Sequence, residues 1–414
     1  MYFNMEYKIS APEKIVSAIK LPSSKSISNR ALILNSLSDS PFPIKNLSDC
    51  DDTEVMIAAF NNEDSNLIDI EASGTAMRFL TAFYSRIPGE RILTGTKRMK
   101  ERPINILVNA LNGMGARIDY LEMPGFPPIK IKGSALNGGE LFLSGSVSSQ
   151  FISAILLIAP ITEKGLVMHL QDDIISVPYI NMTLKMMEEY GVKSIWKDNV
   201  ITVYAQEYIP TEYTVEADWT AASYWYEIAA ISNEAEIKLE GLFEQSVQGD
   251  AKVAELFLDL GIETIHENGY TILRKTNRIT KKFFHNFANE PDLAQTLAVT
   301  CCMMGIPFLF MGLQSLKIKE TDRIEALKVE LRKLGYVLYD SRNDTLEWNG
   351  ERCLPEASPV ISTYEDHRMA MAFAPAAIKM KDLRIAHPNV VTKSYPQYWA
   401  DLKKAGFNIV EENS

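Results

Sequence analysis

Five amphipathic segments of this chain end in the same way, with an apolar residue, a glycine and then a β-rich run. The glycines that close these segments are Gly115, Gly191, Gly261, Gly335 and Gly406. Consecutive glycines are separated by 70 to 76 residues. A glycine directly after a helix adopts the left-handed backbone conformation that other residues resist, so each position suits the end of a helix. Five such endings at nearly constant spacing predict a repeated structural unit, and Asn61 or Asn62 is expected to end a sixth, degenerate copy.

Each interval also contains a second kind of helical segment, which begins at small or polar residues and continues into small apolar ones. These segments are SSKSISNRALIL, SGTAMRFLTAF, SSQFISAILLIA, DWTAASYWYEIAAI, NEPDLAQTLAVT and DHRMAMAFAPAAI. Helices of this composition are usually buried against a sheet or against one another. Between the helical segments lie β-rich runs, such as residues 91–94, 128–132, 141–143 and 165–170. The pattern predicts two helices and several strands in each unit of roughly 70 residues, repeated six times, which suits an α/β protein of two domains.

The composition narrows the range of functions. The chain has 414 residues, of which 46% are hydrophobic, enough for two domains with cores of their own. A formal net charge of −11 argues against a general nucleic-acid binder. The four cysteines show no metal-ligand spacing, and the adjacent Cys301 and Cys302 are expected to be buried thiols. The first residues do not resemble a secretory signal, and the longest apolar run, residues 152–161, is far shorter than a membrane span, so we expect a cytoplasmic protein.

Polar residues open a predicted helix at residues 21–30, where LPSSKSISNR leads into the apolar run ALIL. Free backbone N–H groups at a helix start, together with hydroxyl groups and the cations Lys25 and Arg30, can form a receptor for a phosphate or a carboxylate. A capped amphipathic helix with ordinary surface charges is the alternative interpretation.

Similar helix starts recur along the chain. They lie at residues 72–78, 98–104, 146–150, 319–323 and 366–370. Cations at a helix start oppose the helix macrodipole, so their recurrence costs stability unless an anion binds there. For any single segment, a helix cap or a solvated surface charge remains an alternative. Because no P-loop, dinucleotide fingerprint, catalytic triad order or metal motif accompanies these segments, the residues alone predict an enzyme or binder for small, multiply anionic molecules.

Taken together and in order, the motifs resemble the 3-phosphoshikimate 1-carboxyvinyltransferase (EPSP synthase) family. The resemblance rests on LPSSKSISNRALIL, SGTAMRFLTA, RMKERPI, SGSVSSQF, SVPYINMTL, PDLAQT, KETDRIEAL and YEDHRMAM. It implies a two-domain inside-out α/β barrel of six βαβαββ repeats, three in each domain. The implied domains are residues 21–216, which mainly bind shikimate 3-phosphate, and residues 1–20 with 217–414, which carry the catalytic acid and base and residues for phosphoenolpyruvate. The active site is expected in the cleft between the domains.

The resemblance also implies a reaction of the shikimate pathway, which leads to chorismate and the aromatic amino acids. The 5-hydroxyl of shikimate 3-phosphate adds to phosphoenolpyruvate, and the tetrahedral intermediate then expels phosphate. By motif position, Asp292 is the candidate base for the hydroxyl, and Glu320 is the candidate acid for the methylene carbon. Lys319 is expected to share the proton traffic, and Lys25 to contact both substrates.

The same resemblance implies two sets of binding residues. Those for shikimate 3-phosphate are Lys25, Ser26, Arg30, Ser148, Ser149, Ser176, Tyr179, Asp292, Ser315 and Lys319. Those for phosphoenolpyruvate are Lys25, Gly74, Arg102, Gln150, Arg323, His367, Arg368 and Lys393. Alternative roles remain open for three of them: Asp292 as a helix cap, Tyr179 as a wall residue, and His367 as a residue that only orients its neighbour.

The sequence departs from the family pattern at three places. Ala72 stands where the family usually has an asparagine, which removes an amide beside the phosphoenolpyruvate site. Phe79 follows Arg78 where proline is common, and Ser315 replaces an asparagine. We expect altered affinity and retained activity. Gly74 is kept, and in this family that glycine leaves room for the inhibitor glyphosate, so we expect sensitivity to it.

Two alternative functions agree less well with these residues. An enolpyruvyl transferase acting on UDP-N-acetylglucosamine typically carries a reactive cysteine in a phosphoenolpyruvate loop, and no cysteine here lies in an arginine- or glycine-rich loop. A catalytically inactive, anion-binding relative has no need for proton-transfer carboxylates such as Asp292 and Glu320. We therefore expect a transferase that acts on two small substrates as a monomer, with no cofactor, metal, nucleic acid or membrane partner.

Overall fold

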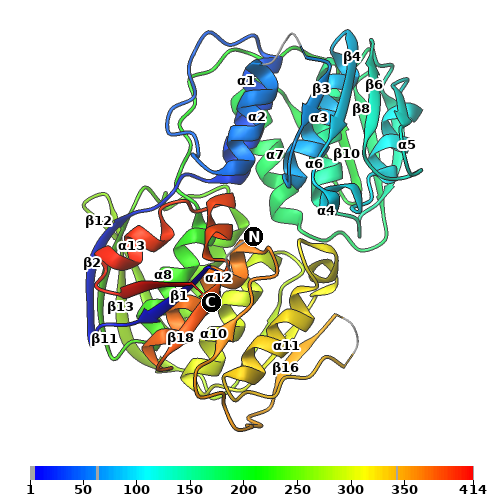
Figure 1. Cartoon of the computed structure of the whole chain (residues 1–414). Coiled ribbons are helices and arrows are strands. Elements are labelled where there is room, and N and C mark those ends of the chain that lie inside the picture. Colours follow the sequence, from blue (N-terminus) through cyan, green and yellow to red (C-terminus); the bar gives the residue numbers. More distant parts are fainter. Residues whose placement is uncertain (1–4, 62–64, 342–343, 414) are drawn as a thin grey trace. The chain divides into compact units, whose positions relative to one another are not determined.

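A computed structural model describes residues 5–61, 65–341 and 344–413 of the chain. These residues form two compact units (Figure 1). The N-terminal unit is Ser23–Val215, and the C-terminal unit comprises the chain up to Pro22 and from Glu216 onward. The boundaries expected from the sequence, 21–216 for the first domain, differ from these by one or two residues. The first residues of the chain therefore belong to the C-terminal unit, the next stretch forms the N-terminal unit, and the remainder completes the C-terminal unit.

The N-terminal unit contains two four-stranded sheets with the same topology, β3-β4-β6-β5 and β7-β8-β10-β9. In each sheet one parallel pair is followed by two antiparallel neighbours. The strands are β3 (Leu67–Asp69), β4 (Gly89–Thr94), β5 (Arg117–Tyr120), β6 (Ile129–Gly133), β7 (Gly139–Ser144), β8 (Leu166–Gln171), β9 (Ser194–Lys197) and β10 (Val200–Val203). The helices are α1 (Lys25–Leu37), α2 (Asp51–Asn61), α3 (Gly74–Arg86), α4 (Lys97–Lys100), α5 (Asn105–Gly113), α6 (Ser149–Ile158) and α7 (Val177–Glu189). Apart from the short α4, each sheet and its helices follow the order βαβαββ.

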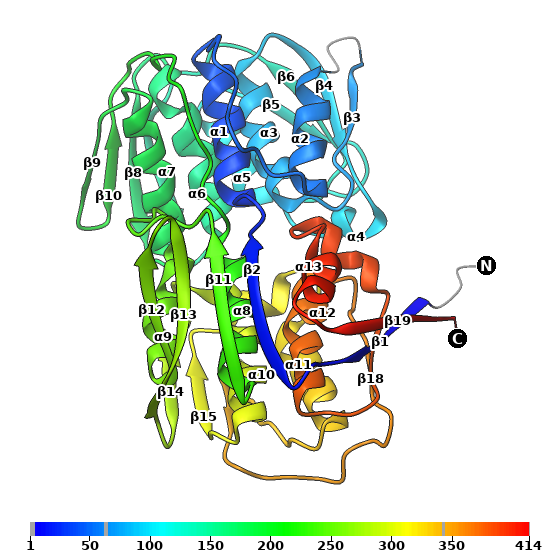
Figure 2. The same cartoon turned by 90° about the vertical axis from the view of Figure 1, so that its left-hand side faces the viewer.

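The C-terminal unit contains three sheets, β12-β13-β11-β2, β14-β15-β16 and β17-β18-β1-β19. The strands are β1 (Met5–Ser10), β2 (Lys14–Lys20), β11 (Glu234–Glu240), β12 (Leu260–Glu267), β13 (Tyr270–Ile279), β14 (Phe283–Asn286), β15 (Phe308–Met311), β16 (Leu346–Trp348), β17 (Val360–Ile361), β18 (Leu383–Ala386) and β19 (Asn408–Asn413). The helices are α8 (Trp219–Ile231), α9 (Val253–Leu258), α10 (Ala294–Met304), α11 (Arg323–Lys333), α12 (His367–Phe373) and α13 (Tyr398–Lys404). Strand β2 pairs in parallel with β11, as Figure 2 shows, and β1 lies between β18 and β19. The start of the chain thus completes two sheets of this unit.

Six full βαβαββ units were expected, and the described residues do not form all of them. The unit around α10 and α11 has a three-stranded sheet, because the run after α11 contributes only isolated bridges at Tyr336 and Tyr339. The first unit keeps its helices α1 and α2, but its strand pairing is reduced to one parallel bridge between Lys45 and Thr214. Prolines on either side of Phe42 offer no backbone donor, which explains why this stretch forms no regular strand.

The glycines that close the repeats have the predicted backbone conformation, although Gly261 lies inside β12, three residues after the end of α9. Their backbone φ angles lie between 83° and 102°, in the left-handed region where a side chain is strained. The degenerate copy is less clear, since Asn61 is the last residue of α2 and Asn62 lies outside the described residues.

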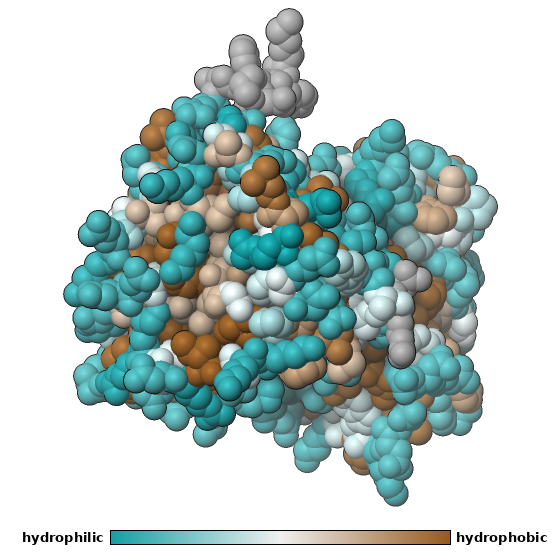
Figure 3. All heavy atoms as spheres, turned by 90° about the horizontal axis from the view of Figure 1, so that it is seen from below, coloured by the Kyte–Doolittle hydropathy of each residue, from teal (hydrophilic) through white to brown (hydrophobic). Residues whose placement is uncertain are grey.

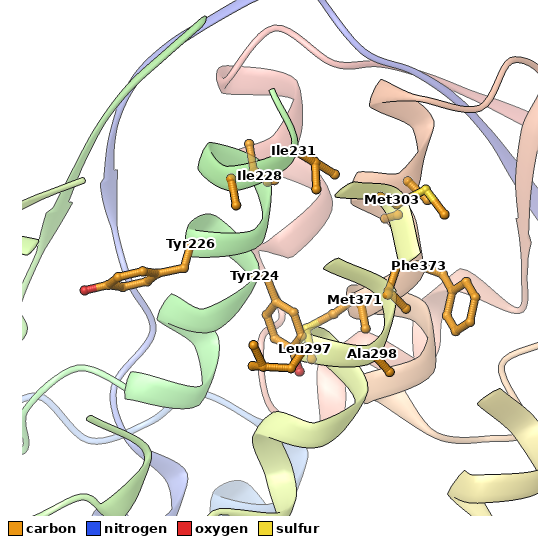
Figure 4. Packing of buried hydrophobic residues seen from close by; sticks show 14 of the residues in the cluster. Tyr224, Tyr226, Ile228, Ile231, Leu297, Ala298, Met303, Met371 and Phe373 are labelled. Carbon is orange, nitrogen blue, oxygen red and sulfur yellow. The ribbon is translucent and has the colours of Figure 1, made fainter. Parts of the chain in front are cut away.

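The small-residue helices form the buried interior of each unit, which confirms their prediction. Every residue of α8 is buried, and α10 packs against both α8 and α12. Figure 4 shows Tyr224 of α8 beside Leu297 and Ala298 of α10 and Met371 of α12. The carbonyl groups at the end of α8 accept hydrogen bonds from the Lys275 ammonium, which caps the negative end of the helix.

The surface and the cysteines agree with a globular protein. Hydrophobic residues reach the face shown in Figure 3 in several separate groups, set among hydrophilic ones. Among the described residues, no helix is both long and apolar enough to cross a membrane. All four cysteines are free thiols, and Cys301 and Cys302 are buried as predicted.

Candidate active site

Arg323 lies at the centre of a cluster of charged side chains in the C-terminal unit. It is the first residue of α11, and Asp322 caps this helix. The guanidinium of Arg323 is buried; its Nε donates to Asp366 at 2.7 Å and its Nη1 to Asp292 at 3.0 Å. Its Nη2 donates to Glu320 at 3.0 Å. One arginine therefore holds carboxylates from three segments that are far apart in the sequence.

Asp292 is surrounded by three cations. It lies in the 3₁₀ turn η3 (Pro291–Leu293) directly before α10, and it accepts a second hydrogen bond, at 2.9 Å, from Nη2 of Arg368. The Nζ atom of Lys319 is 3.8 Å from its Oδ1. Burial alone would raise the pKa of Asp292, but the three cations together hold it well below its usual range. The carboxylate is therefore ionised in the free protein.

Lys393 and Asp366 complete the cluster. Lys393, the last residue of η6 (Pro388–Lys393), places its Nζ 3.1 Å from Oε1 of Glu320. Asp366 caps α12 by accepting a hydrogen bond from the Arg368 N–H, besides holding Arg323. The cations at these helix starts were expected to need an external anion. In the C-terminal unit the protein's own carboxylates supply part of that negative charge.

Two predicted residues differ from the rest of this cluster. His367, the first residue of α12, is buried, with Nδ1 3.9 Å from Oδ1 of Asp366. Ser315 lies half-buried in η4 (Gln314–Ile318) and takes no part in the hydrogen bonds just described.

Sequence reasoning missed two carboxylates that contribute to the site. Asp366 directly precedes a predicted helix, and its sequence position is adequately explained by a helix cap. Asp250 lies in the 3₁₀ turn η2 (Gly249–Lys252) and accepts a hydrogen bond from the Thr220 hydroxyl. Burial, with the nearby charge of Asp292, raises the pKa of Asp250 to about 7. No local pattern signals this residue, since only the fold brings it close to Asp292.

In the N-terminal unit, Lys25 is the first residue of α1, where Ser24 caps the helix. Its Nζ forms an ion pair with Oδ2 of Asp52 at 3.0 Å, and both side chains are largely buried. Asp52, in the first turn of α2, was not predicted as a partner. The ion pair fixes a lysine ammonium group at the start of α1.

Arg30 is held in the core of the same unit. Its guanidinium donates four hydrogen bonds at 2.8–3.3 Å, to the side chains of Thr183 and Ser153 and to the carbonyl groups of Ser26 and Tyr179. The Phe79 ring, which stands where the family commonly has proline, lies 5.2 Å from the guanidinium carbon. Burial lowers the pKa of Arg30 to about 10, so the group still carries its charge at neutral pH.

Gly74, the first residue of α3, is enclosed by two arginines. A Cβ atom on this glycine would lie 2.7 Å from Nη1 of Arg102 and 2.8 Å from Nη1 of Arg78. Nη1 of Arg78 also donates to the carbonyl of Gly74 at 2.9 Å. The Gln150 amide donates to the Thr75 hydroxyl at 3.1 Å, so the starts of α6 and α3 are joined. These contacts gather three of the predicted phosphoenolpyruvate residues around one helix start.

The predicted serines all lie at helix starts. Ser148 caps α6 by accepting a hydrogen bond from the Gln150 N–H at 3.4 Å, and Ser149 is the buried first residue of that helix. Ser176 precedes α7 with a left-handed backbone and makes no side-chain cap bond. Ser148 therefore acts as a helix cap, whereas the Ser176 side chain does not cap α7.

Taken together, the two clusters suit small molecules with several negative charges. Guanidinium and ammonium groups lie beside carboxylates within buried, polar surroundings, where electrostatic interactions are stronger than in water. Within residues 5–61, 65–341 and 344–413, no group of three or more metal-ligating side chains could hold a metal ion.

Comparisons with known proteins agree with this chemistry. The sequence pattern of the family described as EPSP synthase (3-phosphoshikimate 1-carboxyvinyltransferase) matches residues 9–62 and 59–402. A 3-phosphoshikimate 1-carboxyvinyltransferase of Bacteroides fragilis strain YCH46 is 54% identical over 406 residues, covering 98% of this chain and 99% of the relative. The enzyme of the same name from Aliivibrio fischeri strain MJ11 is 36% identical over 94% of this chain and 97% of its own. An EPSP synthase structure from Acinetobacter baumannii superposes with a TM-score of 0.79 at 20% identity, covering 99% of this chain and all of that one, and so has the same mixed α/β fold.

Proposed function

The chain belongs to the EPSP synthase family, the 3-phosphoshikimate 1-carboxyvinyltransferases, and from this premise we propose the reaction that it catalyses. It transfers the enolpyruvyl group of phosphoenolpyruvate to the 5-hydroxyl of shikimate 3-phosphate, giving 5-enolpyruvylshikimate 3-phosphate and phosphate. The observation that carries this proposal is the ionised Asp292 carboxylate held among three cations, since such a group can take a proton beside bound anions.

In the addition step, Asp292 takes the proton of the 5-hydroxyl while the hydroxyl oxygen bonds to the substituted carbon of phosphoenolpyruvate. The methylene carbon gains a proton in the same step, and the proposed donor is Glu320 in its protonated form, which the negative charge of the bound substrates would favour. Lys319 and Lys393 lie on either side of this pair of carboxylates. Burial lowers the pKa of Lys319, against the opposing effect of Asp292, which makes this ammonium a better proton donor than a solvated lysine. Expulsion of phosphate and loss of a methyl proton then restore the vinyl group.

The proposed binding residues are divided between the units. Shikimate 3-phosphate binds mainly to the helix starts of the N-terminal unit, where Lys25 and the serines offer an ammonium group and hydroxyls. For phosphoenolpyruvate, the proposed residues are those around Gly74 in the N-terminal unit, and Arg368 and Lys393 in the C-terminal unit. The dense arrangement of cations supports this assignment, because the two substrates bring two phosphates and two carboxylates.

The barrel architecture, the cellular location and the oligomeric state are also proposals. We propose that each unit is an inside-out barrel, with the buried helices inside and the sheets outside, and the packing of α10 between α8 and α12 supports this. We further propose a cytoplasmic, monomeric enzyme. Four free thiols suit a reducing compartment, and a single chain carries every proposed residue.

The test is phosphate release from phosphoenolpyruvate, with and without shikimate 3-phosphate, for the wild type and for Asp292→Asn. We expect release that requires both substrates and falls by about 100-fold or more in the variant, as for loss of a general base. Asp259→Asn, which changes an exposed partner of Arg278, is the matched control. Substrate binding without release in the wild type would indicate an inactive anion-binding relative. Release with UDP-N-acetylglucosamine in place of shikimate 3-phosphate would assign the chain to that transferase.

A further inference from the structure

Helix α11 carries two buried charged residues on one face, two turns apart. Arg323 at its start holds Asp292, Glu320 and Asp366, as described above. Seven residues later comes Glu330, which is fully buried. Residues separated by seven positions lie on the same face of an α-helix. The face that carries the site arginine therefore continues into a buried carboxylate that the proposed reaction does not use.

Glu330 binds the segment that leads into α12. Its Oε1 accepts a hydrogen bond of 2.6 Å from the Tyr364 hydroxyl, and its Oε2 accepts one of 3.2 Å from the Ser362 N–H. Lys333 donates to Oε2 at 2.7 Å and to the carbonyl of Val360 at 2.8 Å. One carboxylate and its lysine therefore hold three points along residues 360–364.

The held segment has an unfavourable backbone conformation. Tyr364 and Glu365 have φ angles of 55° and 56°, the left-handed region that residues with side chains avoid. They directly precede Asp366, whose N–H donates to the carbonyl of Thr363 at 2.8 Å. Two consecutive strained residues persist only where neighbouring contacts hold them. Besides the bond between Asp366 and Thr363, the contacts of Tyr364 and Ser362 with Glu330 hold this pair.

The strained pair determines where the site residues point. Asp366 follows it immediately and receives Arg323, and two residues later Arg368 donates to Asp292. A change of backbone at residues 364–365 would move Asp366 and the start of α12 together. Helix α11 thus holds this segment through two side chains. Arg323 binds Asp366, and Glu330 binds Ser362 and Tyr364.

We propose that Glu330 is a positioning residue for the reaction and that Tyr364 is its tether, which together set the orientation of Asp366 and Arg368 toward Asp292. The inference rests on the proposed function in so far as Asp292 and Arg368 take part in the chemistry. The high pKa of Tyr364, raised by burial and by its bond to Glu330, agrees with this, because the hydroxyl remains a donor at every physiological pH.

The test compares Tyr364→Phe, which removes only the tethering hydroxyl, with Glu330→Gln, which keeps an oxygen that can accept from Tyr364. Lys328→Gln is the control, since this residue of α11 pairs with Glu325 and Asp340 away from the held segment. Both kcat and the KM of each substrate are measured, together with amide hydrogen exchange of residues 360–368. We expect Tyr364→Phe to lower kcat by about 10- to 100-fold, the effect of a misplacement of about 1 Å, and to raise the KM of phosphoenolpyruvate more than that of shikimate 3-phosphate.

Glu330→Gln keeps an oxygen for the Tyr364 hydroxyl, but its NH2 group cannot accept from the Ser362 N–H or from Lys333. We expect a smaller loss of kcat in Glu330→Gln than in Tyr364→Phe, and faster exchange of residues 360–368 in both variants. Unchanged kinetics and exchange in Tyr364→Phe would overturn the inference, as would equal changes in the KM of both substrates with unchanged kcat. If the wild type released no phosphate, the proposed function would fail. The exchange comparison would still decide whether Tyr364 holds this segment.

Discussion

Glu227 is a carboxylic acid in the middle of α8, where every residue is buried. Neither of its oxygens has a hydrogen-bond partner among the residues that the structure describes. Burial raises the pKa of Glu227 well above its ordinary value, which favours the neutral form of the side chain in the folded protein. Its neighbours in α8 that Figure 4 labels are Tyr226 and Ile228. Replacing this acid should therefore stabilise the protein, by an amount that depends on pH.

The size of the effect follows from proton linkage. In the unfolded chain a glutamate has a pKa of about 4.3, so at pH 7 folding must bind a proton at a cost of up to about 3.7 kcal/mol. Because the folded pKa is the higher one, this penalty is absent below about pH 4.3. It then grows by about 1.4 kcal/mol per pH unit until the folded pKa is reached. The unpartnered carboxyl group costs a further 1–3 kcal/mol or so at any pH.

Two variants separate these contributions. Glu227→Gln abolishes the proton uptake but keeps a buried polar group, so its free energy of unfolding should exceed that of the wild type by about 1 kcal/mol at pH 5 and by up to about 3.7 kcal/mol at pH 7. Glu227→Met has a similar volume and removes both costs, so it should gain roughly 1–3 kcal/mol more at each pH. The assay is urea unfolding followed by tryptophan fluorescence, since four of the five tryptophans belong to the C-terminal unit.

Glu255→Gln is the control, because Glu255 is largely exposed and pairs with Lys252. It should change the unfolding free energy little at either pH. A difference between Glu227→Gln and the wild type that did not vary with pH would refute the linkage argument. A Glu227→Met protein less stable than the wild type would show that the carboxyl group is partnered after all.

Two further predictions concern a site residue and a helix end. Gly74→Ala should change the free energy of unfolding by no more than about 1 kcal/mol, since the crowded atoms are the terminal guanidinium atoms of Arg78 and Arg102. Because the added methyl group displaces these atoms, the KM of phosphoenolpyruvate in the phosphate-release assay should rise by about tenfold. Gly113→Ala, with no atom within 4 Å of the added Cβ, is its control, and an unchanged KM would contradict the proposed role of these arginines. Lys275→Met removes the cation that caps α8 and should lower the free energy of unfolding, measured by urea titration, by about 1–3 kcal/mol. An unchanged free energy of unfolding would mean that water replaces the lysine as hydrogen-bond donor.

Much of the fold was predictable from the sequence, because its signals are local. Glycines such as Gly115 and Gly406 mark helix ends by a backbone conformation that only glycine adopts freely, and all five positions have it. Small apolar residues likewise revealed the buried helices. The strands of the first repeat could not be judged in this way. Whether a run such as residues 41–46 pairs depends on a distant partner, and only Lys45 bridges to Thr214.

The cations of the candidate site could be predicted from the sequence more readily than its carboxylates. Cations at helix starts are conspicuous in a sequence, because they oppose the helix dipole. An acid at the same place is not, since capping already explains it. Asp366 does cap α12, and it also holds Arg323. Asp52 and Asp250 become visible only when the fold brings them beside Lys25 and Asp292.

The pairing of cations with the protein's own carboxylates links substrate binding to the chemistry. In the free protein, Arg368, Lys319 and Arg323 lower the pKa of Asp292, so its affinity for a proton is weak. If the phosphate or carboxylate of a substrate binds beside these cations, it offsets part of their charge and raises the pKa of Asp292 toward a useful value. The proposed base therefore gains its basicity from the substrates themselves. A carboxylate left without these cations would be a stronger base in the free protein, but it would hold the substrate anions less well, because the cations that weaken the base are the ones proposed to bind the anions.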